Sequence, residues 1–320
     1  MDLHGNPGSP GSSQAPRSFH FVQLDVFSRR ALAGNQLAVF LDARGLSDEQ
    51  MQALARETNL CETTFIVPRE EEIERERGVQ VRIFTVAEEL KFAGHPTLGT
   101  ALVLRGQFPE RFKNQVILDL KVGKIPVTFE EQAEGLVFGE MRQPDPEFGA
   151  VHSREKIAAA LGLNLAGIAA DVPVQTVSTG MPFAILPIVS LATLQNIDFS
   201  WSQAANYLAG TDAKFIYLVT RETTSPAVRL HARMIFYNGE DPATGSAAGC
   251  AAAWMVQYGI AAPGEQVQIE QGLEMKRPSQ IFVRADASDE NNGGSAPQRR
   301  VTSVRVGGYA VSVMRGHYNL

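Results

Sequence analysis

Two copies of one short block constrain the fold of this chain more than any other feature of its sequence. The first copy spans 92–101 and reads FAGHPTLGTA, and the second spans 239–248 and reads GEDPATGSAA. Aligned, they place His95 on Asp241, 146 residues apart (241 − 95), and each copy then has a proline, a glycine and a hydroxyl residue at matching places. A spacing kept across a whole block indicates two similar halves.

Each copy has the sequence context of a helix start. A strand-like run precedes it, over 79–85 or 227–237, and an apolar, alanine-rich run follows it, over 98–104 or 247–256. Proline is favoured at the first helical position, where its missing N–H costs nothing. We therefore expect two helices that begin at the blocks, with His95 and Asp241 at or beside the N-cap.

A helix N-terminus carries free N–H groups and a partial positive charge, so it can bind an anion. Small residues inside each start let a ligand approach the backbone. The plainer interpretation is two ordinary core helices without a ligand, but the repetition favours a shared site in a cleft between two lobes. The residues expected to bind a substrate are Asn35, Gly94, Thr97, Gly99, Gly245 and Ser246.

Length and composition fit a globular protein of two domains. The chain has 320 residues, 44% of them apolar and 20% charged. The net charge of −6 comes without a basic block, so no nucleic-acid partner is expected, and no apolar run is long enough to span a membrane. Cys61 and Cys250 form neither a disulfide framework nor a zinc motif. We expect a cytoplasmic protein with no metal or cofactor.

The order of elements is strand, strand, helix, strand, strand, block helix and further strands, run twice. It predicts an α+β fold of two pseudo-symmetric lobes, each a curved, mostly antiparallel sheet wrapped around a central helix. Residues 1–18 are expected to be a disordered tail, 19–130 the first lobe and 131–320 the second, with the final strand a candidate to return to the first lobe. The charged run 69–77 is interpreted as a hairpin tip, and 286–300 as a loop.

Three acid–base groups are candidates for catalysis. Glu62 is a lone carboxylate in an otherwise uncharged strand, and His95 and Asp241 belong to the two blocks. If Glu62 faces a closed cleft, loss of water raises its pKa and makes it a usable general acid or base. The alternatives are an exposed strand residue for Glu62 and a simple helix cap for Asp241.

The motifs that the sequence lacks narrow the chemistry further. There is no glycine-rich dinucleotide or nucleotide loop, no zinc-protease helix and no serine-hydrolase elbow. A carboxylate, an imidazole and an anion site together suit proton transfer at a carbon beside a carboxylate.

The residues along the chain resemble the PhzF family of phenazine-biosynthesis-like isomerases from about residue 19 onward. The motifs that carry the resemblance are Asp25-Val26-Phe27, Gly34-Asn35, Met51 with Ala55-Arg56-Glu57, Glu62-Thr63-Thr64-Phe65, Arg82-Ile83-Phe84-Thr85, the two blocks, and Arg277-Pro278-Ser279.

The resemblance implies the fold of diaminopimelate epimerase, with the active site between two lobes. It implies a cofactor-free isomerase that moves a proton within a small, cyclic carboxylic acid, and a homodimer. The catalytic glutamate of the family motif falls on Glu62, and the supporting histidine and aspartate fall on His95 and Asp241.

Two rival functions stay open at this point. Racemases and epimerases of the same fold use a cysteine at each helix start, whereas here those places hold His95 and Asp241, with Cys61 beside Glu62. The other rival is a non-catalytic binder of a small carboxylate, or an interaction scaffold, that has kept the fold.

Overall fold

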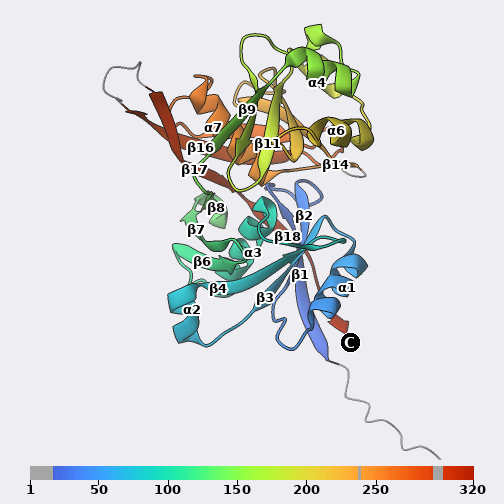
Figure 1. The fold of residues 1–320 in the computed structure, drawn as a ribbon. Helices are drawn as coiled ribbons and strands as arrows, with labels where there is room; N and C mark the ends of the chain where they lie inside the picture. The colour runs from blue at the N-terminus through green and yellow to red at the C-terminus, as the bar shows by residue number, and fades with distance from the viewer. Residues whose placement is uncertain (1–16, 237–238, 291–297) are drawn as a thin grey trace, which may run out of the picture.

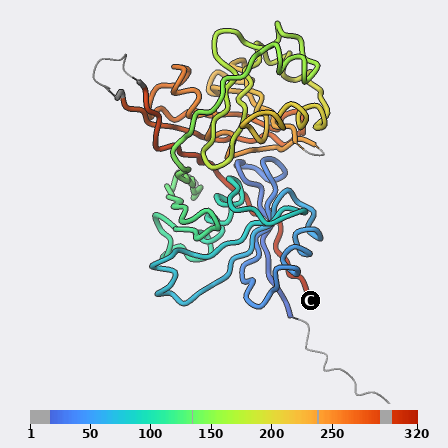
Figure 2. The backbone as a smooth tube through the Cα atoms, in the orientation of Figure 1, coloured from blue at the N-terminus to red at the C-terminus, as the bar shows by residue number. Residues whose placement is uncertain are grey.

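The computed structural model describes residues 17–236, 239–290 and 298–320. Figure 1 shows two lobes stacked one above the other. The lower lobe contains α1–α3 and the blue and teal strands, and the upper lobe contains α4, α6, α7 and the green to brown strands. Figure 2 traces the first and last described segments of the chain into the same lower lobe.

The first lobe alternates strands with three helices. Its elements are β1 (Ser18–Val26), β2 (Asn35–Phe40), α1 (Asp48–Thr58), β3 (Glu62–Val67), α2 (Glu71–Arg77), β4 (Val79–Phe84), β5 (Glu89–Leu90), α3 (Gly94–Gln107), β6 (Gln115–Leu120), β7 (Gly123–Glu131) and β8 (Val137–Arg142), joined at the end of the chain by β18 (Ala310–Asn319).

The second lobe has four helices. Its elements are β9 (Glu147–His152), α4 (Arg154–Leu161), β10 (Val174–Ser178), β11 (Pro182–Pro187), α5 (Leu191–Gln195), α6 (Trp201–Leu208), β12 (Phe215–Thr220), β13 (Leu230–Phe236), β14 (Gly239–Asp241), α7 (Gly245–Gln257), β15 (Val267–Gln271), β16 (Ser279–Glu290) and β17 (Gln298–Gly308).

The strand pairings repeat between the lobes. The first sheet has the order β18–β1–β2–β3–β4–β6–β7–β8, with β2–β3 and β4–β6 parallel. The second has the order β9–β10–β11–β12–β13–β15–β16–β17, with β11–β12 and β13–β15 parallel. All other neighbours in these two orders are antiparallel. The β8–β17 pair joins the two sheets into one.

Each sheet curves around one central helix. The residues of α7 from Gly245 to Val256 are all buried, and most of α3 is buried as well. Their alanines and glycines let the strands pack closely on every side, which is why these helices are apolar all round rather than amphipathic. The outer helices α1, α4 and α6 cover other parts of the sheets (Figure 1).

The charged run at 69–77 lies at the tip of the antiparallel β3–β4 hairpin, as interpreted from the sequence, and its residues Glu71–Arg77 form helix α2 there. Acidic residues occupy the first turn and Arg75 and Arg77 the last, an order that complements the helix dipole. Arg75 also forms an ion pair with Glu71 one turn away. Glu74 is buried and pairs with Arg111, which fixes α2 to the lobe.

Two other segments have bounds in the structure that differ from those predicted from the sequence. Much of the loop predicted over 286–300 is an antiparallel ribbon, because β16 continues to Glu290 and β17 begins at Gln298, while 291–297 lie outside the described residues. Of the tail predicted over 1–18, residues 1–16 also lie outside them. Arg17 belongs to the folded part, since its backbone exchanges hydrogen bonds with Leu320 (2.8 and 2.9 Å).

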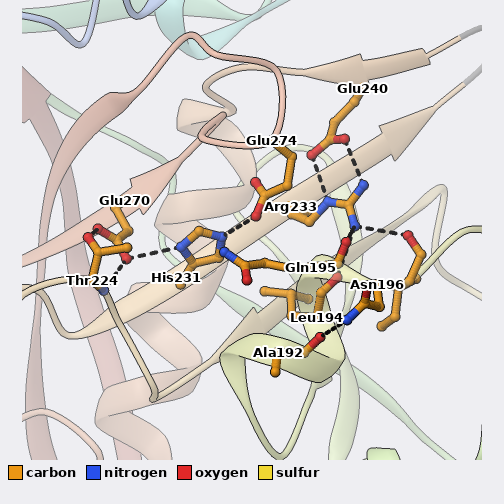
Figure 3. A network of polar contacts seen from close by, with 11 residues as sticks. Ala192, Leu194, Gln195, Asn196, Thr224, His231, Arg233, Glu240, Glu270 and Glu274 are labelled. Carbon is orange, nitrogen blue, oxygen red and sulfur yellow. Dashed lines mark hydrogen bonds and ion pairs between the residues drawn. The ribbon is translucent and has the colours of Figure 1, made fainter.

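A polar network joins strands of the second lobe (Figure 3). The guanidinium of Arg233 donates to both carboxylate oxygens of Glu240, at 2.9 Å each, and to the carbonyls of Leu194 and Ile197. The fully buried ring of His231 lies between Glu270 (Nδ1 to Oε1, 3.0 Å) and Glu274 (Nε2 to Oε1, 2.9 Å).

We expect the His231 network to stabilise the protein most below neutral pH. Burial acts to lower the pKa of His231, but its hydrogen bonds to Glu274 and Glu270 outweigh burial and raise the pKa. A raised pKa contributes stability that is complete below the ordinary value of about 6.5 and is lost as pH rises through the folded value. The difference in unfolding free energy between wild type and His231→Gln, from urea titrations, should therefore shrink as pH rises above about 6.5. The exposed His317→Gln is the control, and a difference independent of pH would contradict this assignment.

Candidate active site

The two helix starts predicted from the repeated block meet backbone to backbone. A Cβ atom added to Gly94, the first residue of α3, would lie 2.9 Å from the amide nitrogen of Ser246 and 3.0 Å from Gly245 Cα. Gly245 is the first residue of α7. Because the first N–H groups of a helix have no intrahelical acceptor, two positive helix ends converge at the boundary between the lobes.

Glu62 reaches this meeting point from the start of β3. Glu62 is the first residue of β3 and pairs with Leu37 of the neighbouring parallel strand β2, which begins at Asn35. Glu62 Oε2 lies 3.3 Å from His95 Nε2, and the two side chains are 17% and 5% exposed. The geometry does not make a hydrogen bond, so both atoms are buried without a partner among the described residues. Two unpartnered polar atoms that face each other are suited to receive a ligand.

Asn35, the first residue of β2, links His95 to Asp241. Its amide nitrogen donates to Asp241 Oδ1 (2.7 Å) and to the carbonyl of Ala243 (2.9 Å), and it lies 3.2 Å from His95 Nδ1. The amide has only two hydrogens, so the longer contact to His95 is the weakest of the three. Asn35 Oδ1 has no partner among the described residues.

Asp241 does not cap its helix, contrary to the sequence prediction. It is the last residue of β14, three positions before the N-cap Thr244 of α7, because Pro242 and Ala243 form a turn outside the helix. The Thr244 hydroxyl donates to Asp241 Oδ2 at 2.6 Å. Both carboxylate oxygens of Asp241 therefore accept a hydrogen bond. His95 is the second residue of α3, two positions past the N-cap Ala93, so it lies inside the helix rather than at or beside the cap.

Burial separates the protonation states of the three groups. Burial, and secondarily the charge of Asp241, raises the pKa of Glu62 to about 8. Burial also raises the pKa of Asp241 to about 6, against hydrogen bonds from Thr244 and Asn35 that favour the ion. For His95 burial lowers the pKa to about 3. At neutral pH the site holds a mostly protonated Glu62, an ionised Asp241 and a neutral His95, a pattern typical of catalytic sites.

The remaining predicted site residues lie at different depths in the two helices. Ser246 is in the first turn of α7, at the contact described above. The hydroxyl of Thr97 donates to the carbonyl of Ala93 within its own helix. A Cβ at Gly99 would lie 2.6 Å from a methyl group of Leu37 and 2.8 Å from one of Val26. Thr97 and Gly99 therefore serve packing of α3, and their predicted contact with substrate finds no support in this geometry.

Two further residues around the site were missed as site residues by sequence reasoning. The side chain of Arg277, from the second lobe, donates to Asp25 Oδ1 (2.6 Å) and to the carbonyl of Gly34 (2.8 Å) in the first lobe. Gln271 contacts Asp241 and Thr244. Arg277 lies in a quoted motif, but nothing in the sequence around Gln271 marks it, because its partners are 27 and 30 residues away.

Neither cysteine is placed or charged for catalysis at a helix start. Cys61 is exposed, yet partial burial of its thiol and the nearby charges of Asp241 and Glu62 raise its pKa. Burial raises the pKa of Cys250, inside α7, to about 11. Both are therefore protonated at neutral pH, and a thiol is a poor base.

No group of three or more His, Cys, Asp or Glu side chains in 17–236, 239–290 and 298–320 is arranged to hold a metal ion. None of the helices in this part of the chain has the length and apolar character needed to cross a membrane.

Comparison with known proteins identifies the family of this protein. The sequence matches the PhzC-PhzF family, described as phenazine biosynthesis-like protein, over residues 24–316. It is 35% identical to an uncharacterized isomerase of Mesorhizobium japonicum, over 93% of this chain and 97% of that protein. It is 32% identical to the trans-2,3-dihydro-3-hydroxyanthranilate isomerase of Pseudomonas aeruginosa, over 92% of this chain and 98% of that protein.

Solved structures give the same answer for the fold. A PhzF-family protein of Bacillus anthracis superposes with a TM-score of 0.81 over 94% of this chain and 99% of its own, at 24% identity. A hydroxyproline epimerase of Agrobacterium vitis shares the fold, with a TM-score of 0.62 over 96% and 93% of the two chains at 10% identity. The protein is an isomerase of the PhzF family with a diaminopimelate epimerase-like fold.

The contact at Gly94 gives a prediction about the join between the lobes. Gly94→Ala places a methyl group against backbone atoms that cannot rotate away, so we expect a loss of about 1–3 kcal/mol in unfolding free energy, measured by thermal or urea unfolding. The matched control is Gly106→Ala in the same helix, where a Cβ meets nothing within 4 Å. Replacing glycine by alanine in an open helical position should stabilise by about 0.5–1 kcal/mol. Equal effects of the two substitutions would show that the helix starts do not press together.

Proposed function

We propose that this protein moves a proton at a carbon of a small, cyclic carboxylic acid without a cofactor, using Glu62 as the general acid and base. The observation that carries the proposal is the pair of buried, unpartnered atoms Glu62 Oε2 and His95 Nε2, 3.3 Å apart beside two converging helix starts. The substrates named for the Pseudomonas relatives are of this chemical class.

The proposed reaction begins when ionised Glu62 removes a proton from carbon and ends when it returns the proton to another carbon. With a pKa of about 8, Glu62 populates both forms near neutral pH, which suits a group that must first accept and then donate. Neutral His95 lies within reach of the same proton. Removal of the proton places negative charge on the substrate carboxylate. Fixed N–H donors at Gly94, Gly245 and Ser246 would stabilise that charge, by about 3–4 kcal/mol per well-placed donor.

Asp241 holds the rest of this arrangement in place. As an anion it accepts from Asn35 and Thr244, so it fixes the amide that contacts His95. It cannot bind the substrate carboxylate directly, because two anions would repel each other. Asn35 then presents its unpartnered Oδ1 as an acceptor for a polar group of the substrate.

A deuterium wash-in screen tests the proposal. The protein is incubated in deuterated water with small cyclic and amino carboxylic acids, starting with trans-2,3-dihydro-3-hydroxyanthranilate, and exchange at carbon is followed by NMR or mass spectrometry. Exchange with a cyclic acid supports the proposal. Binding of such acids without exchange supports the rival of a non-catalytic carboxylate binder, and exchange at the α-carbon of an amino acid supports the racemase rival.

Glu62→Gln should abolish most of the exchange while the fold survives. The amide keeps the size of the side chain but cannot carry the proton, so the exchange rate should fall by about 10²–10⁴-fold or more. The melting temperature should stay the same or rise, because a carboxylate whose pKa is raised by burial destabilises the fold above its ordinary pKa. The control is Glu57→Gln, an exposed carboxylate on α1. A folded Glu62→Gln protein with near-normal exchange would exclude Glu62 as the acid and base.

The double variant Cys61→Ala, Cys250→Ala tests the rival two-thiol mechanism. Both thiols have raised pKa values, and Cys250 lies inside α7 rather than at its start. Most of the exchange activity should therefore remain, in the double variant and after iodoacetamide treatment of the wild type. Loss of exchange on replacing Cys61 alone would instead indicate a mixed site of Cys61 and Glu62.

Two further features of the proposal concern assembly and location. From the family resemblance the protein is proposed to be a homodimer, which sedimentation velocity at several concentrations would test. From its composition and cysteine usage it is proposed to act in the cytoplasm, where a fluorescent fusion would locate it.

A further inference from the structure

Gln271 lies at the end of β15 and is completely buried beneath the turn that carries Asp241. Its amide nitrogen donates to the backbone carbonyl of Asp241 (2.7 Å) and to the hydroxyl of Thr244 (3.0 Å). Its amide oxygen accepts from the backbone N–H of Thr244 (3.1 Å) and from the hydroxyl of Tyr217 (2.9 Å). One side chain thus holds both ends of the turn between β14 and α7.

The directions of these bonds follow from covalent chemistry alone. The N–H of Thr244 can only donate and the carbonyl of Asp241 can only accept, so the amide of Gln271 has a single orientation that satisfies both. The nitrogen of Gln271 then donates to the hydroxyl of Thr244. That hydroxyl has one hydrogen, and its other polar contact is Asp241 Oδ2 at 2.6 Å.

We propose that Gln271 is a positioning residue for Asp241, which aims the hydroxyl of Thr244 at the carboxylate and so holds it ionised beside Asn35. The result is an ordered chain of donors from Tyr217 through Gln271 and Thr244 to Asp241. This inference rests on the proposed function only for its effect on catalysis; the effect on the carboxylate itself is independent of it.

The surroundings of Asp241 show why such a chain matters. The carboxylate is buried, and the charge of Glu240 adds to the effect of burial in raising its pKa. Its other titratable neighbours are Glu62, the thiol of Cys61 and the phenol of Tyr217, with Arg277 near Cys61. Neutral His95 lies beyond Asn35. Donated hydrogen bonds, from Thr244 above all, are therefore the main force that keeps Asp241 charged.

The polar network in Figure 3 holds β14 and β15, the two strands that carry Asp241 and Gln271, in place. Glu270, the neighbour of Gln271 on β15, accepts from the backbone N–H of Thr224 (2.8 Å) and contacts His231 at 3.0 Å. Glu240, the neighbour of Asp241 on β14, is held by Arg233 at two points. Gln271 and Asp241 are thus each supported by an adjacent residue.

The matched control is a second tyrosine–glutamine pair in the same lobe. The hydroxyl of Tyr258 donates to Gln175 Oε1 (2.5 Å), and the amide nitrogen of Gln175 donates to the carbonyl of Gly149 (3.0 Å). This pair has no contact with Asp241 or Thr244 in the described structure. Gln175→Met and Tyr258→Phe therefore remove the same chemical groups without touching the turn.

The test measures the titration of Asp241 directly in the full-length protein. Carbon-13 NMR of protein labelled at aspartate carboxyl groups follows the titration, and the signal is assigned by its loss in Asp241→Asn. In wild type the pKa should be about 6. In Gln271→Met it should rise by about one pH unit or more, because the thioether cannot hold the Thr244 hydroxyl toward the carboxylate. Tyr217→Phe, which keeps the donors of Gln271, should raise it less.

The outcomes separate this inference from the proposed function. The inference is supported if Gln271→Met or Tyr217→Phe raises the pKa of Asp241 and the two control variants do not, even when no acid tested undergoes exchange. The inference fails if the Asp241 titration is unchanged in folded Gln271→Met and Tyr217→Phe, whether or not the wild type exchanges a substrate. Where exchange is found, its loss at low pH should move upward in Gln271→Met by the same amount as the NMR titration. If Gln271→Met does not fold, Tyr217→Phe alone decides.

Discussion

The contact between the backbones of Gly94 and Gly245 is the constraint on which the site depends. Helix ends can approach so closely only where neither has a side chain at the contact, which explains why positions 94 and 245 are glycine. The contact brings two partial positive charges to one point, between lobes that each supply one helix. The three acid–base groups of the site come together near this contact. Glu62 arrives from β3, His95 from α3, and Asp241 from the turn before α7.

Burial disfavours the charged form of each of these three groups, and hydrogen bonding decides how far the pKa of each group shifts. Every charged form is penalised by loss of water, so the pKa of each carboxyl rises and that of the imidazole falls. Asp241 receives hydrogen bonds from Asn35 and Thr244, and its pKa stays below that of Glu62, whose Oε2 receives none from the described residues. In the proposed reaction the two carboxylates take different roles, one as a fixed anion and one as a proton carrier.

The signals in the sequence were sufficient for the fold, and they marked Glu62, His95 and Asp241, which the structure brings together. The capping box of Ser47 and Gln50 and the apolar runs of α3 and α7 are local patterns, and the repeated block reveals the two halves because it recurs 146 residues later. What the sequence did not reveal depends on tertiary packing. Helix α2 at the tip of the β3–β4 hairpin is fixed by Glu74 and its distant partner Arg111, and a Cβ atom at Gly99 would press against Leu37. Gln271 acts through partners on other elements, so no pattern around it announces its position.

The pairing of β1 with β18 has a consequence for how the chain is made. β1 begins at Ser18 and β18 at Ala310, 292 residues later (310 − 18), yet the two strands are partners along their whole length. During synthesis the first lobe must wait with an open sheet edge until nearly the entire second lobe has emerged from the ribosome. Open edges invite pairing with other chains, and contacts between distant residues form slowly. We therefore expect chaperones to act mainly on the newly made first lobe.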